Sequence, residues 1–255
     1  MPQTVIENPI INSPFTEPDQ HFRFTDEGIT NEIVAGRRIS SYFIPIARPK
    51  KQGKQLVLDT EWTEDRIEEN RFVNRVRERV KQWRTGGYVG VTATTRHLLS
   101  YWTDAHRERK LFFCQIEALE TAIYINEVAA KYGDAWIENH LREANDSSNP
   151  GLPRMAVKMA TGSGKTVVMA MLVAYQALNK LANQQDARFT DSFLIICPGI
   201  TIRDRLRVLL PHDPGNYYRS ATFCRRNYWN DFNRRASLLQ TFMPSNNERR
   251  SQPAS

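Results

Sequence analysis

The chain has 255 residues, of which 40% are hydrophobic and 25% charged, enough to bury one large core or two small ones. This composition excludes fibrous, collagen-like and wholly disordered proteins. The longest uncharged apolar stretch, Thr166–Leu178, is shorter than the roughly 18 residues that a membrane-spanning helix requires. The cysteines at 114, 197 and 224 are far apart, which argues against disulfides and a zinc site. We therefore expect a cytoplasmic protein.

Positive charge is concentrated at the C-terminal end. The formal net charge is +7, but residues 219–255 alone carry seven arginines against only Asp231 and Glu248. Residues 1–218 are nearly neutral, so the bulk charge gives little support for a nucleic-acid-binding protein.

The first 62 residues indicate an extended arm, because proline and turn residues alternate with short β-type runs such as 40–47. A strong helix is expected next, over Glu64–Arg84, and Gly86 and Gly87 are expected to end it. The apolar face of this helix consists of Val73, Val76, Val80 and Trp83.

The other side of this predicted helix carries both acidic and basic residues. Mixed charges at helical spacing are typical of a solvated face, which is the interpretation we favour, and a DNA-binding surface is the alternative. The charged residues are Glu64, Glu68, Arg71, Arg75, Arg79 and Lys81.

Further along the chain, the pattern predicts two helices, over Thr95–Arg109 and from Phe112 to Lys131, with a stop at Gly133. After a polar break at 145–151, the order becomes strand, loop, helix, strand, helix. This order is that of a βαβ unit, which implies parallel strands in an α/β sheet. Its elements are a buried strand at Met155–Ala160, a helix at Lys165–Leu181, a strand at Ser192–Cys197 and a helix at Thr201–Leu210.

A glycine-rich loop lies between the first strand and the first helix of this unit. Residues 160–166, called the phosphate loop below, read Ala-Thr-Gly-Ser-Gly-Lys-Thr, which is the end of a P-loop motif. Its glycines permit positive φ and a close approach of backbone N–H groups to phosphate, and the helix N-terminus adds partial positive charge. Lys165 is expected to contact the β- and γ-phosphates as the catalytic lysine, and the Thr166 hydroxyl to hold Mg²⁺. The expected ATP ligands in the loop are Thr161, Gly162, Ser163, Gly164, Lys165 and Thr166.

Three segments together resemble a known family. Met159 followed by the phosphate loop resembles the first motif of superfamily 2 helicases and translocases, and more narrowly that of the ATPase (Res) subunit of type III restriction enzymes. Residues 112–122, Phe-Phe-Cys-Gln-Ile-Glu-Ala-Leu-Glu-Thr-Ala, are similar to the segment that precedes the loop in that family. Residues 197–206, Cys-Pro-Gly-Ile-Thr-Ile-Arg-Asp-Arg-Leu, resemble its motif Ia. The N-terminal arm is also similar, so the resemblance spans roughly residues 5–218.

The resemblance implies an ATP- and Mg²⁺-dependent motor on double-stranded DNA, with a modification (methyltransferase) subunit as a partner. It also implies that Gln115 reads adenine through a bidentate amide contact and that motif Ia contacts the DNA backbone. As alternatives, Gln115 caps or decorates its helix, and the arginines of 203–207 are solvated helix residues. The expected DNA contacts in motif Ia are Pro198, Gly199, Thr201 and Arg203.

We therefore predict an α/β fold, namely an incomplete P-loop NTPase (RecA-like) parallel sheet preceded by a helical region and an extended arm. Such an ATPase needs an adjacent acidic pair to hold Mg²⁺ and orient water, and none follows the loop. We expect an N-terminal fragment of a longer machine that does not hydrolyse ATP alone. The predicted divisions are an arm at 1–62, a helical region at 63–111, a partial ATP-binding domain at 112–218 and an irregular basic tail at 219–255.

Other interpretations stay open for the tail and for the function. Codons for Cys224–Arg250 exist whose shifted frame reads as a helix and a strand, so we expect a frameshift, with a genuine disordered basic tail as the alternative. A different P-loop enzyme, such as a kinase or a GTPase, is one rival function. A GTPase would need Asn/Thr-Lys-x-Asp for guanine, and the run that starts at Asn179 lacks the Asp. A non-catalytic nucleic-acid-binding product is the other rival.

Overall fold

The computed structural model describes residue 6 and residues 8–25, 28–43, 67–220 and 240–242. The chain divides into two compact units, Met1–Gly87 and Tyr88–Ser255. The frameshift prediction, which concerns 224–250, falls almost entirely outside the described residues. So does the predicted start of the first helix at Glu64.

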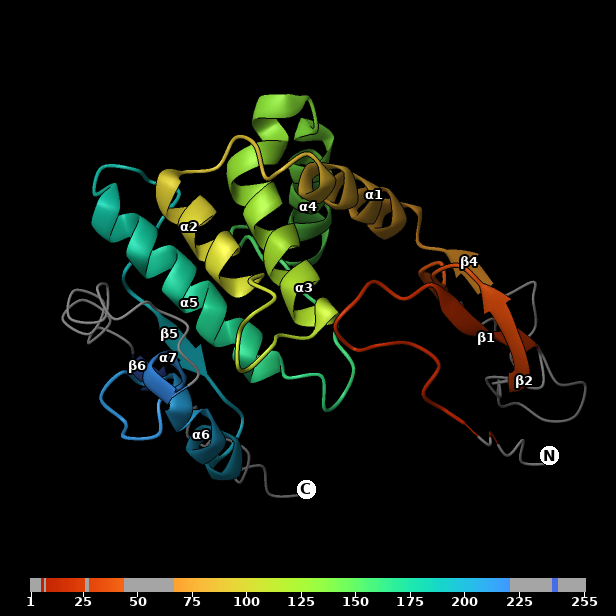
Figure 1. The fold of residues 1–255 in the computed structure, drawn as a ribbon. Coiled ribbons are helices and arrows are strands. Elements are labelled where there is room, and N and C mark those ends of the chain that lie inside the picture. The colour runs from red at the N-terminus through yellow and green to blue at the C-terminus, as the bar shows by residue number, and fades with distance from the viewer. Residues whose placement is uncertain (1–5, 7, 26–27, 44–66, 221–239, 243–255) are drawn as a thin grey trace, which may run out of the picture. The chain divides into compact units, whose positions relative to one another are not determined.

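The first unit consists of two strand pairs and one helix (Figure 1). A hairpin and a second, shorter antiparallel pair precede the helix, so the short strands expected in the arm are present. The elements are β1 (Gln20–Thr25) paired with β2 (Gly28–Ala35), β3 (Ser41–Phe43) paired with β4 (Ile67–Glu69), and α1 (Arg71–Thr85).

The helix α1 begins seven residues later than the sequence pattern predicts. The Asn70 side chain caps it, because its Oδ1 accepts a hydrogen bond of 3.3 Å from the backbone N–H of Val73. Residues 67–69 pair with β3 instead, and the N–H of Asn70 donates to the carbonyl of Ser40 at 2.8 Å. Pairing with a distant strand therefore outcompetes the local helical periodicity, which carries no information about such a partner.

The end of α1 and its buried face agree with the prediction. The N–H of Gly86 donates to the carbonyl of Gln82 at 2.9 Å, and Gly87 has a φ of 80°. Val76, Val80 and Trp83 are buried, as the apolar spacing predicts, and Val73 of the same face is half-buried.

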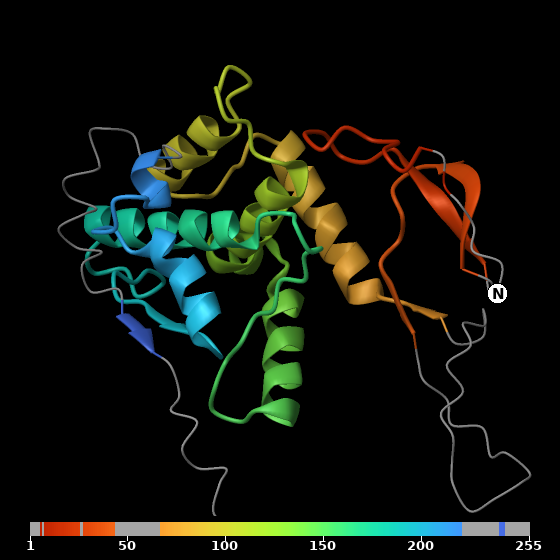
Figure 2. The same cartoon turned by 90° about the horizontal axis from the view of Figure 1, so that it is seen from below.

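The second unit is mainly helical, and its centre is the long helix α5 (Figure 1 and Figure 2). The α5 helix packs against α2, α3 and α7. In the described part of the chain, no helix is both long and apolar enough to cross a membrane. The helices are α2 (Ala93–Trp102), α3 (Phe113–Ile123), α4 (Ala135–Ser148), α5 (Lys165–Ala182), α6 (Ile200–Leu206) and α7 (Tyr217–Ser220).

Several helix boundaries in this unit differ from the prediction. The α2 helix ends at Trp102 rather than at Arg109, and a 3₁₀ turn at Arg207–Leu209 follows α6. The α3 helix continues into a π turn at Tyr124–Val128 and a 3₁₀ turn that ends at Gly133, where φ is 85° as expected of a stop. The α4 helix was not predicted, and its last turn includes part of the expected polar break.

The prediction of a buried strand at Met155–Ala160 is wrong. This segment belongs to no strand, and Met155 and Val157 are 44% and 41% exposed. A buried strand needs a neighbour that satisfies its N–H and C=O groups, and the described residues supply none for this segment. The predicted βαβ unit around α5 is therefore not formed.

The parallel pairing that is present joins different segments. The strand β5 (Leu194–Ile196) pairs in parallel with β6 (Gln240–Phe242). The strand β6 lies inside the predicted irregular tail, so the tail is not irregular throughout. On β5 only Ile195 is buried, because Leu194 and Ile196 point to the exposed face.

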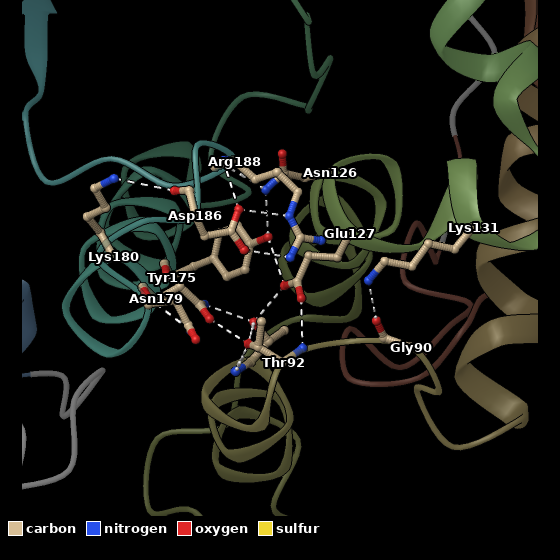
Figure 3. A network of polar contacts seen from close by, with 12 residues as sticks. Gly90, Thr92, Asn126, Glu127, Lys131, Tyr175, Asn179, Lys180, Asp186 and Arg188 are labelled. Carbon is tan, nitrogen blue, oxygen red and sulfur yellow. Dashed lines mark hydrogen bonds and ion pairs between the residues drawn. The ribbon is translucent and has the colours of Figure 1, made fainter.

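A buried polar network stabilises the second unit near the start of α2 (Figure 3). The carboxylate of Glu127, which is 2% exposed, accepts hydrogen bonds from the Thr92 N–H (2.8 Å), the Thr95 hydroxyl (2.6 Å) and the Tyr175 hydroxyl (2.9 Å). Asn179 of α5 also donates to the Thr95 hydroxyl, at 2.8 Å. Burial, and then the Glu127 carboxylate, raise the pKa of Tyr175, so its hydroxyl keeps its proton and remains a donor.

Replacing Glu127 is expected to destabilise this unit strongly. Glu127→Ala leaves two buried hydroxyl groups and the half-buried N–H of Thr92 without this acceptor, which we expect to lower the free energy of unfolding by about 3 kcal/mol or more. Glu138→Ala is the matched control, because it breaks an exposed 2.9 Å ion pair with Arg142 that is worth about 0.5 kcal/mol or less. Urea unfolding measures the free energy of unfolding of both variants. Equal losses of stability in the two would contradict the central role of the network.

Candidate nucleotide-binding site

The phosphate loop has the backbone conformation that its glycines predict. Gly162 and Gly164 have φ angles of 79° and 82°, in the left-handed region that residues with a Cβ avoid. An added Cβ at Gly162 would meet nothing within 4 Å, whereas one at Gly164 would collide with the Nε2 atom of Gln115. The second glycine is therefore required for two reasons, its backbone angle and the side chain beside it.

The carbonyl oxygen of Ala160 organises the inside of the loop. It accepts hydrogen bonds from the Ser163 hydroxyl at 2.6 Å and from the Lys165 Nζ at 2.9 Å. Lys165 is exposed, and its ammonium group thus lies over its own loop. A bound phosphate would compete with the carbonyl of Ala160 for this ammonium group.

The helix α5 begins where the loop ends. Gly164 is its N-terminal cap, and the carbonyl of Gly164 accepts from the N–H groups of Val167 (2.9 Å) and Val168 (3.3 Å). The first N–H groups of a helix have no partner within the helix and carry partial positive charge. The start of α5 therefore offers an anion a set of donors next to Lys165 and Thr166.

Gln115 touches the loop although it stands 48 residues before Ser163. Its Nε2 donates to the carbonyl of Ser163 at 3.0 Å, and its Oε1 accepts from the N–H of Phe112 at 3.0 Å. The side chain is 5% exposed, so both ends of the amide are engaged in a buried position. The helix-capping contact considered as the alternative is present, and adenine recognition stays a prediction.

Cys114 lies beside the same loop carbonyl. Its Sγ is 4.0 Å from the carbonyl oxygen of Ser163. Burial raises the pKa of the Cys114 thiol, so the group stays protonated at neutral pH. No sequence pattern singled out this thiol, because its closeness to the loop depends on the packing of α3 against α5.

Motif Ia (197–206) lies at the junction of β5 and α6. Cys197 is 1% exposed, as expected for a small core residue, and Gly199 caps α6. Pro198, Thr201 and Arg203 are exposed, so they are accessible to a partner, and Arg203 pairs with Asp204 at 3.1 Å. These positions agree both with contacts to the DNA backbone and with residues that are merely solvated. The phosphate contact of motif Ia therefore stays a prediction.

The residues of the loop fit Mg²⁺. In the described part of the chain, no group of three or more His, Cys, Asp or Glu side chains could hold a metal ion. Mg²⁺ on a nucleotide needs no such cage, since it is held by phosphate oxygens, water and one or two protein oxygens. The hydroxyl of Thr166, in the first turn of α5, is the loop group that would supply a protein oxygen.

A cavity of about 980 Å³ lies elsewhere in this unit, and no residue of the phosphate loop lines it. It is bounded by α3 and its π turn, by α4, by residues 151–155 and by the middle of α5. Two of its lining residues connect it to the buried network, because the Asn126 Nδ2 donates to the Tyr175 hydroxyl at 2.9 Å. Sequence reasoning missed it because α4, which forms one wall, was not predicted.

Comparison with known proteins identifies one family. Residues 108–231 match the family model described as "Type III restriction enzyme, res subunit". The match covers just under half of the chain and includes Gln115, the phosphate loop and motif Ia, but not the N-terminal arm. It also continues beyond Tyr218, the predicted end of the resemblance. No curated protein and no solved structure matches the chain significantly.

Proposed function

We propose that this chain, which carries a domain of the type III restriction enzyme res subunit family at residues 108–231, is part of an ATP-dependent DNA translocase or helicase. It binds ATP and Mg²⁺ through the phosphate loop and the backbone of duplex DNA through motif Ia. A modification methyltransferase subunit is the protein partner that we propose with it. The single observation that carries the ATP-binding part is the buried contact of Gln115 with Ser163 of the loop.

The phosphate loop is suited to bind a nucleoside triphosphate. Two glycines in the left-handed region bring backbone N–H groups to the surface of the loop, and the N-terminus of α5 adds partial positive charge. Lys165 leaves the carbonyl of Ala160 to neutralise charge on the β- and γ-phosphates. Mg²⁺, when bound beside the Thr166 hydroxyl, supplies further neutralisation between these phosphates.

Gln115 is suited to select the base. A glutamine amide presents one donor group and one acceptor, which match the N7 acceptor and the N6 amino donor of adenine. In the structure these two groups are used by Ser163 and Phe112. On binding adenine, Gln115 therefore exchanges its two hydrogen bonds within the protein for two with the base. Because Ser163 belongs to the phosphate loop, recognition of the base is coupled to this loop.

Gln115→Ala is expected to remove the preference for ATP over GTP and CTP. A bidentate amide contact is worth about 1–3 kcal/mol of base discrimination, which is roughly a 5- to 150-fold difference in affinity. Competition of the three nucleotides against a labelled ATP analogue measures this preference in the presence of Mg²⁺. Cys114→Ala is the matched control, because its Sγ also lies near Ser163 but cannot read a base.

The same experiment separates base recognition from bracing of the loop. If Gln115 only holds Ser163 in place, Gln115→Ala weakens the binding of all three nucleotides by the same factor. The order of their affinities then stays unchanged. That result would remove Gln115 from the adenine role. If the wild-type chain binds no nucleoside triphosphate at all, the ATP-binding part of the proposal is wrong.

A further inference from the structure

Ser163 lies at the centre of the contacts inside the phosphate loop. Its hydroxyl donates to the carbonyl of Ala160 at 2.6 Å, and its own carbonyl accepts from the Gln115 Nε2 at 3.0 Å. The carbonyl of Ala160 also accepts from the Lys165 Nζ at 2.9 Å. One residue therefore links the side chain that we propose to read the base with the side chain that we propose to neutralise the phosphates.

The Ser163 hydroxyl already uses its only proton. A serine hydroxyl has a single proton to donate, and the oxygens of a phosphate act as acceptors. The distance of 2.6 Å to the Ala160 carbonyl is at the short end of the range for O–H···O hydrogen bonds. The side chain of Ser163 therefore has to give up Ala160 before it can donate to a phosphate, which favours a role inside the loop over a direct contact with the nucleotide.

A matching hydroxyl contact occurs elsewhere in the same unit. Near the end of α4 the Ser147 hydroxyl donates to the carbonyl of Ala144 at 3.0 Å, again from a serine to an alanine three residues earlier. Such contacts are ordinary features of turns and helix ends. The contact in the phosphate loop differs from this one because the accepting carbonyl of Ala160 also holds the ammonium group of Lys165.

This shared carbonyl makes the release of Lys165 depend on Ser163. A carbonyl oxygen has two acceptor lone pairs, and the hydroxyl and the ammonium group donate to this one together. When the ammonium group moves to a phosphate, the hydroxyl remains as a partner of the carbonyl. Without the hydroxyl, only the longer bond of 3.4 Å from the Ser163 N–H remains within the described part of the chain. The departure of Lys165 then costs more free energy, because the carbonyl loses its last close protein donor.

We propose that Ser163 is a positioning residue that keeps Lys165 available for the β- and γ-phosphates of ATP by acting through the carbonyl of Ala160. This role rests on the proposed function, because it requires that the phosphate loop binds ATP. The hydroxyl then acts on the lysine and not on the nucleotide. Ser163→Ala is therefore expected to weaken the binding of Mg·ATP by roughly 2- to 12-fold, which is the net effect of one hydrogen bond.

A double-mutant cycle with Lys165→Ala tests this role in the full chain. Displacement of a labelled ATP analogue by Mg·ATP gives the affinities of the wild type, the two single variants and the double variant. Because Ser163 acts through the lysine, Ser163→Ala is expected to weaken binding in the wild-type background and to change nothing in the Lys165→Ala background. Ser163→Thr keeps the hydroxyl and is expected to keep the wild-type affinity. Ser147→Ala is the matched control, because it removes the same kind of contact outside the loop and should leave the affinity unchanged.

The outcomes separate this role from the proposed function. Equal losses from Ser163→Ala in the two backgrounds overturn the role, because they indicate a direct phosphate contact or a general loss of loop structure. An unchanged affinity in Ser163→Ala overturns it as well, and so does a loss in Ser163→Thr that is as large as the loss in Ser163→Ala. A wild-type chain that binds no nucleoside triphosphate overturns the proposed function and this role with it, whereas ATP binding with an additive cycle overturns this role alone.

Discussion

Lys165→Ala is expected to weaken the binding of Mg·ATP by roughly 10- to 150-fold while leaving salt-dependent binding to duplex DNA unchanged. A hydrogen bond to a charged group contributes about 1.5–3 kcal/mol, and we propose that this lysine contacts the nucleotide phosphates rather than the DNA. In the structure Nζ lies over the loop, 2.9 Å from the carbonyl of Ala160. Anisotropy of a labelled ATP analogue and of a labelled duplex measures the two affinities.

Lys158→Ala is the matched control for this prediction. Lys158 is also exposed and stands seven residues before Lys165, outside the phosphate loop, so its loss removes the same charge without removing a phosphate ligand. We expect its affinity for ATP to stay within about twofold of wild type, because an exposed charge outside the site is strongly screened. Equal ATP affinities in the Lys165→Ala variant and in this control would show that the loop is not the nucleotide site.

Gly164→Ala is expected to abolish measurable ATP binding. The φ of 82° costs a residue with a Cβ about 1–2 kcal/mol. The new Cβ also collides with the Nε2 of Gln115, which is buried and held by hydrogen bonds at both ends of its amide. Displacing that side chain gives up two hydrogen bonds, worth about 1–3 kcal/mol together, so the binding conformation of the loop is penalised by about 2–5 kcal/mol.

Two further variants isolate the collision from the backbone strain. Gly162→Ala introduces the same kind of strain, at a φ of 79°, but its Cβ meets nothing within 4 Å. Its affinity for ATP is expected to fall only 5- to 30-fold, because the backbone strain costs about 1–2 kcal/mol. Adding Gln115→Ala to Gly164→Ala removes the colliding atom. The double variant should therefore bind ATP only 5- to 30-fold more weakly than the Gln115→Ala variant alone, which corresponds to the backbone strain of about 1–2 kcal/mol. Equal losses at the two glycines, with no rescue, would contradict the importance of the Gln115 contact.

The sequence by itself determined the features of the site that are local. The glycine spacing of 160–166 determined the positions with positive φ, because only glycine adopts that region without strain. The apolar periodicity after the loop located α5 to within one residue at each end, since an amphipathic helix is encoded by neighbours three and four residues apart. The helix stops at Gly87 and Gly133, with φ angles of 80° and 85°, follow from the same backbone chemistry. The family resemblance, confirmed over 108–231, depends on motifs in order along the chain.

Only the tertiary structure decided the features that depend on partners distant in sequence. Apolar composition indicated a strand at 155–160, but a strand forms only where another strand pairs with it, and β5 pairs with β6 instead. Residues 67–69 have helical periodicity, yet they pair with β3 and leave α1 as a basic helix. The contact of Gln115 with Ser163 joins residues 48 positions apart through the packing of α3 on α5. Periodicity along the chain cannot predict such a contact, because it depends only on neighbouring residues.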